Sequence, residues 1–187
     1  MPILPRETDV FPHDFLEFED FFLGTERQWW VLYTLSRREK DLMRRLVSME
    51  VPFYCPLIAR KNRSPSGRVR TSYLPLFPGY VFCCATPEQR QQALTTNCIS
   101  RTLPVVDHET LVQDLRQIRR LIESDTPLSP ESRIQPGALV RVKNGPMTGI
   151  EGVVLKRHNG DRLLVSIRFL QQGASVALED YQVEEIG

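Results

Sequence analysis

The sequence predicts an α+β protein in two folded parts, because helix and strand patterns alternate through its first two thirds and strand patterns alone fill the rest. Apolar residues recur at helical spacing in 38–50 and 108–124, whereas 137–187 alternates with a period of two. A polar stretch with three prolines, 124–136, lies between the parts. We expect a mixed or antiparallel sheet with packed helices over 28–123, an extended linker, and a small closed β-barrel over 137–187.

The first part is expected to begin with a strand at WWVLYTLS, which is rich in aromatic and β-branched residues. An amphipathic helix follows, with Leu42, Leu46 and Met49 on one stripe. A second helix should start after Thr86, which can form a capping box with Gln89. The expected order is therefore strand 29–36, helix 38–50, a hairpin of strands 51–61 and 68–75, strand 79–84, helix 87–97, strand 99–106 and helix 108–124.

The charge is distributed unevenly, although the chain as a whole has a net charge of only +1. Residues 1–27 hold 2 basic and 7 acidic residues, whereas 28–123 hold 15 basic and 8 acidic residues. Such a basic part can attract nucleic acid or an acidic protein. The candidate phosphate-binding residues are Arg37 and Arg38 together with the expected hairpin's Arg60, Lys61, Arg63, Arg68 and Arg70. Alternatively, such charges only solvate the surface.

The N-terminal extension, residues 1–27, carries five phenylalanines among its acids and shows no regular helical stripe. Its composition favours a disordered tail. The alternative is a docking segment that folds on a partner, or whose residues 11–22 cover an apolar face of the basic part.

The four cysteines, Cys55, Cys83, Cys84 and Cys98, have no metal-ligand spacing. We expect small buried thiols in a cytoplasmic protein, because no signal sequence or membrane-spanning run is present. The histidines have no nucleophile or ligand motif beside them. The sequence therefore predicts a binding protein without cofactor or metal rather than an enzyme.

The segment PLFPGYVF, residues 75–82, places a Pro-Gly turn before an apolar strand. Side chains alternate along a strand, so Tyr80 and Phe82 share one face and Val81 and Cys83 share the other. Both faces are apolar. The strand is therefore either enclosed in the core or exposes its aromatic face to a partner.

Two segments resemble known motifs. GALVRVKNGPMTGIEGVV, residues 137–154, resembles the KOW motif of an SH3-like barrel, while WWVLY and the later PLFPGYVF resemble the NusG N-terminal domain. The order of the two domains is also similar, and the resemblance covers about 28–187. Together these motifs resemble the NusG family of transcription elongation factors. PLFPGYVF with a short basic hairpin, and WWVLY in place of the usual WYV, favour a specialised paralogue. The acidic extension is not part of the family pattern.

The resemblance implies binding to RNA polymerase, modulation of pausing or termination, and recruitment of a further protein. In that family the N-terminal domain docks on the clamp helices of the largest polymerase subunit, and the matching residues are Trp30, Tyr33, Phe77, Pro78, Gly79, Tyr80 and Phe82. A second polymerase contact would come from Gln91, Gln92, Thr95 and Thr96.

The resemblance also implies that upstream or non-template DNA passes close to the basic residues. The strand segment 167–174 matches the region that binds ribosomal protein S10 or termination factor Rho, with Phe169 and Leu170 as candidates. The protein is expected to act as a monomer, with no membrane contact. The alternative is a ribosome-associated RNA-binding KOW protein, which would account for the barrel but not for PLFPGYVF.

Overall fold

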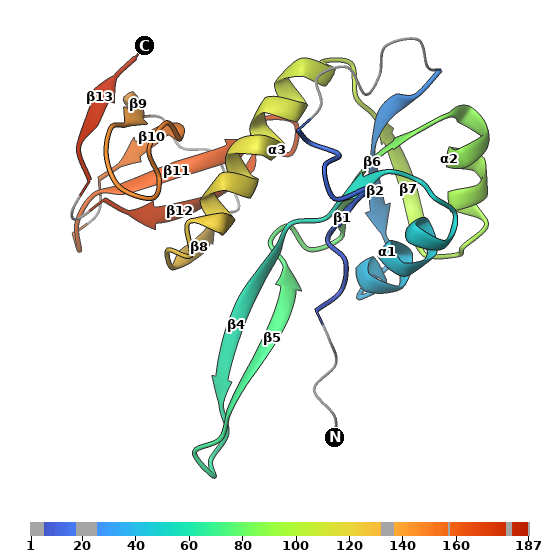
Figure 1. Cartoon of the computed structure of the whole chain (residues 1–187), viewed down its shortest axis with the longest axis horizontal. Helices are drawn as coiled ribbons and strands as arrows, with labels where there is room; N and C mark the ends of the chain where they lie inside the picture. The colour runs from blue at the N-terminus through green and yellow to red at the C-terminus, as the bar shows by residue number, and fades with distance from the viewer. Residues whose placement is uncertain (1–5, 18–25, 132–136, 157, 179–180, 187) are drawn as a thin grey trace. The chain divides into compact units, whose positions relative to one another are not determined.

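The computed structural model describes residues 6–17, 26–131, 137–156, 158–178 and 181–186 (Figure 1). Contacts divide the chain into an N-terminal unit, Met1–Val106, and a C-terminal unit, Asp107–Gly187. Each unit has its own β-sheet, and the expected α+β class is confirmed. Within the described part of the chain, no helix combines the length and the apolar character that crossing a membrane requires.

The N-terminal unit is built on a five-stranded antiparallel sheet in the order β1-β3-β6-β2-β7 (Figure 1). Strand β6 pairs along its full length with residues 28–33 of β2, with Tyr33 opposite Tyr80 and Trp29 opposite Cys84. The strands of this sheet are β1 (Val10–Phe11), β2 (Gln28–Thr34), β3 (Phe53–Tyr54), β6 (Tyr80–Ala85) and β7 (Ile99–Pro104).

Helices α1 (Glu39–Ser48) and α2 (Pro87–Leu94) cover one face of this sheet. The predicted capping box starts α2: the side chain of Thr86 accepts from the N–H of Gln89, whose side chain accepts from the N–H of Thr86. Leu42 and Leu46 of α1 are fully buried against the sheet, as their spacing predicts. The same core contains Val81 and Cys83 of β6, which therefore lie on the helix-covered face.

The opposite face of the sheet is also mostly buried. Trp29, Val31 and Phe82 share this face by strand alternation and pairing, and none of them is more than 1 % exposed. The ring of Phe15 packs 5.0 Å from that of Trp29. The sheet is therefore enclosed on both sides near its middle, and among the described residues it is the Tyr33–Tyr80 end that retains partly exposed aromatic side chains on this face.

The described part of the N-terminal extension is folded, in contrast to the expected disordered tail. Strand β1 pairs antiparallel with β3, and Phe15 and Leu16 are 1 % and 2 % exposed. The physical reason is that an open sheet edge offers backbone partners and that burial of apolar side chains offsets the cost of ordering the chain. Phe15 packs at the Trp29 end of β2, away from Tyr33. In the segment 11–22, which was expected as an alternative to cover an apolar face, residues 18–22 lie outside the described residues.

Strands β4 (Leu57–Arg63) and β5 (Val69–Pro75) form a separate two-stranded sheet. They pair antiparallel in full register from Leu57 opposite Pro75 to Arg63 opposite Val69. The hairpin projects from the body of the N-terminal unit (Figure 1). Most of its side chains are exposed, in contrast to the enclosed five-stranded sheet.

In its described residues, the C-terminal unit contains one helix and a six-stranded antiparallel sheet in the order β13-β9-β10-β11-β12-β8. No pairing between described residues joins the edge strands β13 and β8, so the closure expected for a barrel stays a prediction. The elements are α3 (His108–Glu123), β8 (Leu128–Glu131), β9 (Leu139–Val142), β10 (Glu151–Leu155), β11 (Arg162–Ile167), β12 (Gln172–Ala177) and β13 (Val183–Glu185).

Two features of this unit differ from the sequence-based organisation. Residues 128–131 of the expected extended linker form β8 and pair with β12. Helix α3, which the sequence groups with the first part, packs on β11 in the C-terminal unit. An amphipathic helix needs a partner for its apolar stripe, but the stripe itself does not specify which sheet provides it.

Candidate functional site

The exposed aromatic site of the N-terminal unit consists of Tyr33, Pro78, Gly79 and Tyr80, which we call the tyrosine surface. Tyr33 of β2 and Tyr80 of β6 are direct cross-strand partners, and their ring centroids are 5.1 Å apart. Both side chains are half-buried, and Pro78 beside them is exposed. The guanidinium of Arg101 lies 4.9 Å above the Tyr33 ring, so a cation borders the aromatic pair.

Gly79 is held on three sides. Its N–H donates to the Oε1 of Glu39 at 2.7 Å, and its carbonyl accepts from the N–H of Thr34 at 2.8 Å. Its φ of +85° is in the left-handed region, and a Cβ added there would lie 3.1 Å from Cε2 of Tyr33. Glycine is therefore the residue that permits both this backbone conformation and the close approach of the tyrosine ring.

Glu39 was not recognised from the sequence as a site residue. It is the first residue of α1 and is only 9 % exposed, and its carboxylate reaches a turn that follows forty residues later. No local sequence signal indicates such a long-range contact. The carboxylate connects α1 to the Pro78–Gly79 turn and so fixes the position of the tyrosine surface.

Phe77 and Phe82 support this surface from inside. They are 2 % and 0 % exposed, and their rings meet edge to face with centroids 6.5 Å apart. The carbonyl of Phe77 also accepts from the N–H of Tyr80 at 3.1 Å, which closes the turn. The predicted sharing of a face by Tyr80 and Phe82 holds, but Phe82 is enclosed and exposes no ring to a partner.

Trp30 lies on the other face of β2, away from Tyr33. It packs against the core under α1 and α2, and the guanidinium of Arg90 lies 4.6 Å from its ring centroid. The sequence contains the signal for this difference, because residues an odd number apart on a strand point to opposite faces. The structure therefore does not bring Trp30 together with Tyr33 and Tyr80.

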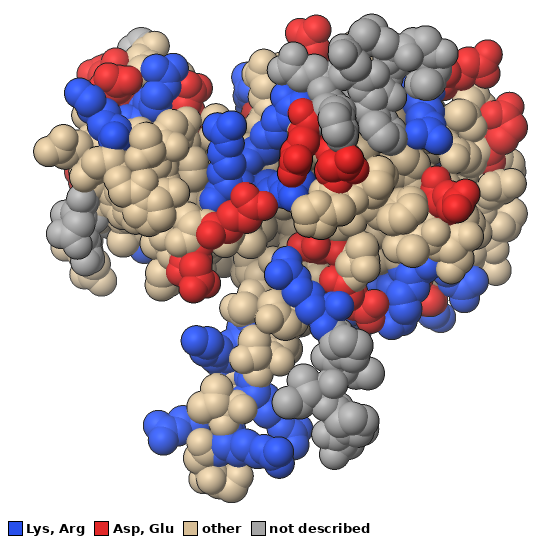
Figure 2. Space-filling model, viewed as in Figure 1, with Lys and Arg blue, Asp and Glu red and all other residues tan. Residues whose placement is uncertain are grey.

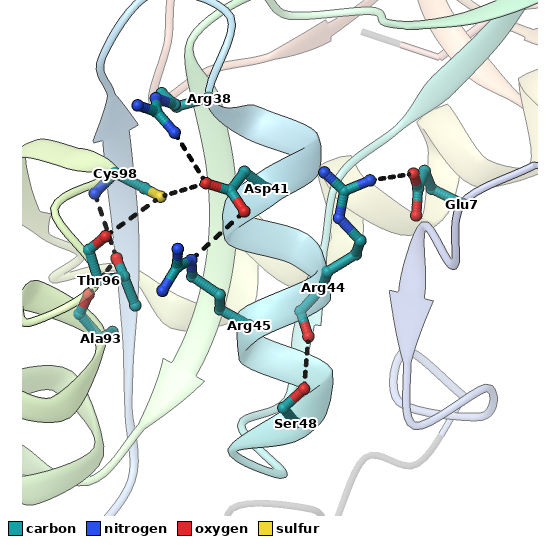
Figure 3. Close-up of polar contacts among 9 residues, drawn as sticks. All are labelled: Glu7, Arg38, Asp41, Arg44, Arg45, Ser48, Ala93, Thr96 and Cys98. Atoms are coloured by element: carbon teal, nitrogen blue, oxygen red, sulfur yellow. Dashed lines mark hydrogen bonds and ion pairs between the residues drawn. The ribbon is translucent and has the colours of Figure 1, made fainter. Parts of the chain in front are cut away.

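Four residues near the end of α2 are candidates for a second polymerase contact. Three of them are exposed and one is buried. Gln91, Gln92 and Thr95 are exposed, whereas Thr96 is 6 % exposed. The hydroxyl of Thr96 donates to the carbonyl of Ala93 at 2.7 Å and accepts from the N–H of Cys98 at 3.3 Å (Figure 3). Thr96 therefore stabilises the C-terminal end of α2 and is not part of the exposed surface there.

Three arginines at α1, the N-cap Arg38 and the helix residues Arg44 and Arg45, are paired with nearby acids. Asp41 pairs with Arg38 at 3.0 Å and with Arg45 at 3.3 Å, and Arg44 pairs with Glu7 at 2.7 Å (Figure 3). The hydrogen bond from the Cys98 thiol, together with both arginines, lowers the pKa of Asp41. Arg38 is therefore less available to a phosphate than its sequence suggests, while the side chain of Arg37 is exposed.

The basic hairpin differs from α1 in having no acidic partners. Arg60, Lys61, Arg63, Arg68 and Arg70 are all exposed. None of the five forms an ion pair with another residue in the described ranges. In Figure 2 the projecting hairpin carries basic side chains, and no acidic one is visible on it. This is the strongest candidate for an anion-binding surface.

All four cysteines are free and buried, which confirms the expectation of buried thiols. Burial raises the pKa of Cys84 to about 12 and is also the main cause of the raised pKa values of Cys55, Cys83 and Cys98. Thiols in this state are protonated at neutral pH and are poor nucleophiles.

In the C-terminal unit, the candidates Phe169 and Leu170 lie in the turn between β11 and β12, where the sequence predicted a strand. Phe169 is 38 % exposed. The preceding Arg168 is fixed by the buried Asp114 of α3, which accepts from its backbone N–H at 2.8 Å and from its Nη2 at 2.8 Å. The ion pair with Asp114 holds this turn against α3.

Comparison with known proteins agrees with this architecture. The family model of transcription termination factor nusG matches residues 27–134. The transcription termination/antitermination protein NusG of Pseudomonas aeruginosa is 26% identical over 86% of this chain and 99% of its own length. The protein of the same name from Buchnera aphidicola is 25% identical over 86% of this chain and 97% of its own length. The chain thus belongs to the NusG family of transcription termination and antitermination proteins.

Proposed function

We propose that this NusG-family protein binds the elongating RNA polymerase through the tyrosine surface and modulates pausing or termination. The observation that carries the proposal is the pair of half-exposed rings, Tyr33 and Tyr80, presented on a turn that Glu39 holds in place. Tyrosine suits such a surface because it buries a large apolar area with few rotatable bonds and keeps a polar hydroxyl. The resemblance to the family indicates the clamp helices of the largest subunit as the partner.

Burial assigns different roles to the other candidates. Phe77 and Phe82 hold the turn and the strand from inside, so in this proposal they support the contact without making it. Gln91, Gln92 and Thr95 remain candidates for a second polymerase contact, because they are exposed on or next to one helix. The side chain of Trp30 lies outside the proposed surface.

The C-terminal unit is proposed to recruit a second protein through the β11–β12 turn. Phe169 provides exposed apolar area there, and the bonds between Asp114 and Arg168 hold the turn in one conformation. The family resemblance indicates ribosomal protein S10 or Rho as partners. Binding of either protein should depend on Phe169 and be independent of Tyr80.

The test is copurification with core RNA polymerase from cell extract. Tyr33→Ala/Tyr80→Ala should lose polymerase, with each ring costing about 2 kcal/mol of binding, the usual size for a hot-spot residue. Tyr181→Ala, which removes a half-buried tyrosine from the C-terminal unit, is the matched control and should retain polymerase. Unchanged polymerase recovery for the double variant, with a normal unfolding curve, would refute the proposal. Recovery of ribosomal RNA without polymerase would support the ribosome-associated alternative.

A further inference from the structure

The β4–β5 hairpin carries charge on both of its faces. Its pairing register places Lys61 and Arg63 on one face, opposite Thr71 and Val69. Arg60 and Arg70 lie on the other face, because they alternate with these positions. Residues 57–75 contain five cations and no carboxylate, and the described residues supply none of the five with an ion pair.

This arrangement is costly for a protein that binds nothing with the hairpin. An isolated two-stranded hairpin is only marginally stable. No two cations are direct cross-strand partners, but Lys61 with Arg63 and Arg60 with Arg70 are neighbours on a shared face and repel each other. Four other arginines of the N-terminal unit have nearby carboxylates, in the pairs Arg6–Asp9, Arg38–Asp41, Arg45–Asp41 and Arg44–Glu7. Among the described residues, the hairpin that projects from the unit thus groups five cations without an ion pair on one short element (Figures 1 and 2).

We infer that this hairpin is a two-faced β-ribbon that lies in the major groove of double-stranded DNA. The inference goes beyond the proposed polymerase contact: the family resemblance implies only that DNA passes close to the basic residues, and the register of the hairpin indicates which form of DNA is bound and how. Each strand has 7 residues, so the ribbon is about 24 Å long at about 3.4 Å per residue. The major groove, about 12 Å wide, admits a two-stranded ribbon and presents a phosphate backbone on either side. The cations of the two faces would then contact opposite backbones.

Single-stranded nucleic acid fits the hairpin less well. Proteins that bind single strands without sequence preference generally stack bases on aromatic rings. Tyr73 is the hairpin's one aromatic residue; it lies toward the base, is half-buried, and has the guanidinium of Arg6 5.2 Å from its ring centroid. An acidic protein surface would contact one face of the ribbon and leave the charges on the other face without a role.

The test measures binding of the full chain to a fluorescein-labelled 24-base-pair DNA duplex by anisotropy, at several salt concentrations. Lys61→Gln/Arg63→Gln removes the cations of one face, and Arg60→Gln/Arg70→Gln removes those of the other. Arg120→Gln/Lys156→Gln removes two exposed cations of the C-terminal unit and is the matched control. Thermal unfolding checks that every variant is folded.

Each face variant should make the slope of log K against log salt concentration shallower by about 1.8, since each of the two lost phosphate contacts accounts for about 0.9. Affinity should fall about 60-fold at 0.1 M salt by the same relation. The control should bind like the wild type. A loss confined to one face, or equal or tighter binding to single-stranded DNA or to double-stranded RNA, would overturn the inference. The face variants should still copurify with polymerase, because the proposed polymerase contact depends on Tyr33 and Tyr80. A failure of the DNA inference can thus be distinguished from a failure of the proposed polymerase contact.

Discussion

Replacing Gly79 by alanine tests whether the tyrosine surface is held as the structure indicates. The added Cβ faces two separate costs. The φ of +85° is unfavourable for an L-residue, and the new methyl group lies 3.1 Å from Cε2 of Tyr33. The ring cannot retreat without disturbing its contacts with Tyr80 and Arg101. Gly79→Ala should therefore both destabilise the N-terminal unit and displace the ring that we propose to contact polymerase.

The magnitude follows from the two terms. A left-handed conformation costs an alanine about 1–2 kcal/mol, and overpacking adds about 1–3 kcal/mol. Gly67 is a control in the same unit, because its φ is +79° but a Cβ there would meet nothing within 4 Å. Gly67→Ala should therefore cost at most about 2 kcal/mol, since only the backbone term applies. The difference between the two variants isolates the contact with Tyr33.

The assay is urea unfolding followed by tryptophan fluorescence. Both tryptophans of the chain, Trp29 and Trp30, lie on β2, so their emission reports the N-terminal unit alone. Gly79→Ala should also weaken binding to core polymerase free of nucleic acid, while Gly67→Ala should not. Equal losses of unfolding free energy in the two variants would refute the reasoning, because Tyr33 would then have moved at no cost.

Three further predictions concern the interior and the helix ends. Phe82→Ala should cost about 3–5 kcal/mol of unfolding free energy, because its ring is fully buried, and a loss under about 1 kcal/mol would contradict that burial. Hydrogen bonds from Thr110 lower the pKa of Asp107 below its ordinary 3.8, so this carboxylate's contribution to stability is complete above that value and is lost as the pH falls through the folded pKa. Between pH 5 and 2, thermal unfolding of the wild type should show this loss of stability as Asp107 becomes protonated. Asp107→Asn keeps the helix cap but cannot titrate, so it should lack that loss; identical pH profiles for the two proteins would contradict the role of Asp107. A thiol reagent at pH 8 should modify none of the four cysteines of the folded chain and all four after unfolding, because burial raises the pKa of Cys84 to about 12 and the other thiols are equally enclosed; rapid modification of the folded chain would contradict this.

Local patterns in the sequence determined most of the elements. The stripe of Leu42 and Leu46 and the capping box at Thr86 predicted α1 and α2, because helix periodicity and capping act over three or four residues. The alternation of 80–83 correctly separated Tyr80 and Phe82 from Val81 and Cys83. The motifs around WWVLY and PLFPGYVF also indicated the family that the comparisons show.

The tertiary structure decided which parts of these faces are exposed and which segments join the sheets. Alternation shows that Tyr80 and Phe82 share a face, but only packing with Phe77 and neighbouring residues encloses Phe82 and leaves Tyr80 half-exposed. The pairing of β1 with β3 and of β8 with β12 joins residues 42 to 48 positions apart, from Phe11–Phe53 to Leu128–Val176, so no nearby residues signal it. The contact of Glu39 with Gly79 is equally distant in sequence. Periodicity reports the geometry of one element, whereas the choice of its neighbours depends on the burial and hydrogen bonding of the whole chain.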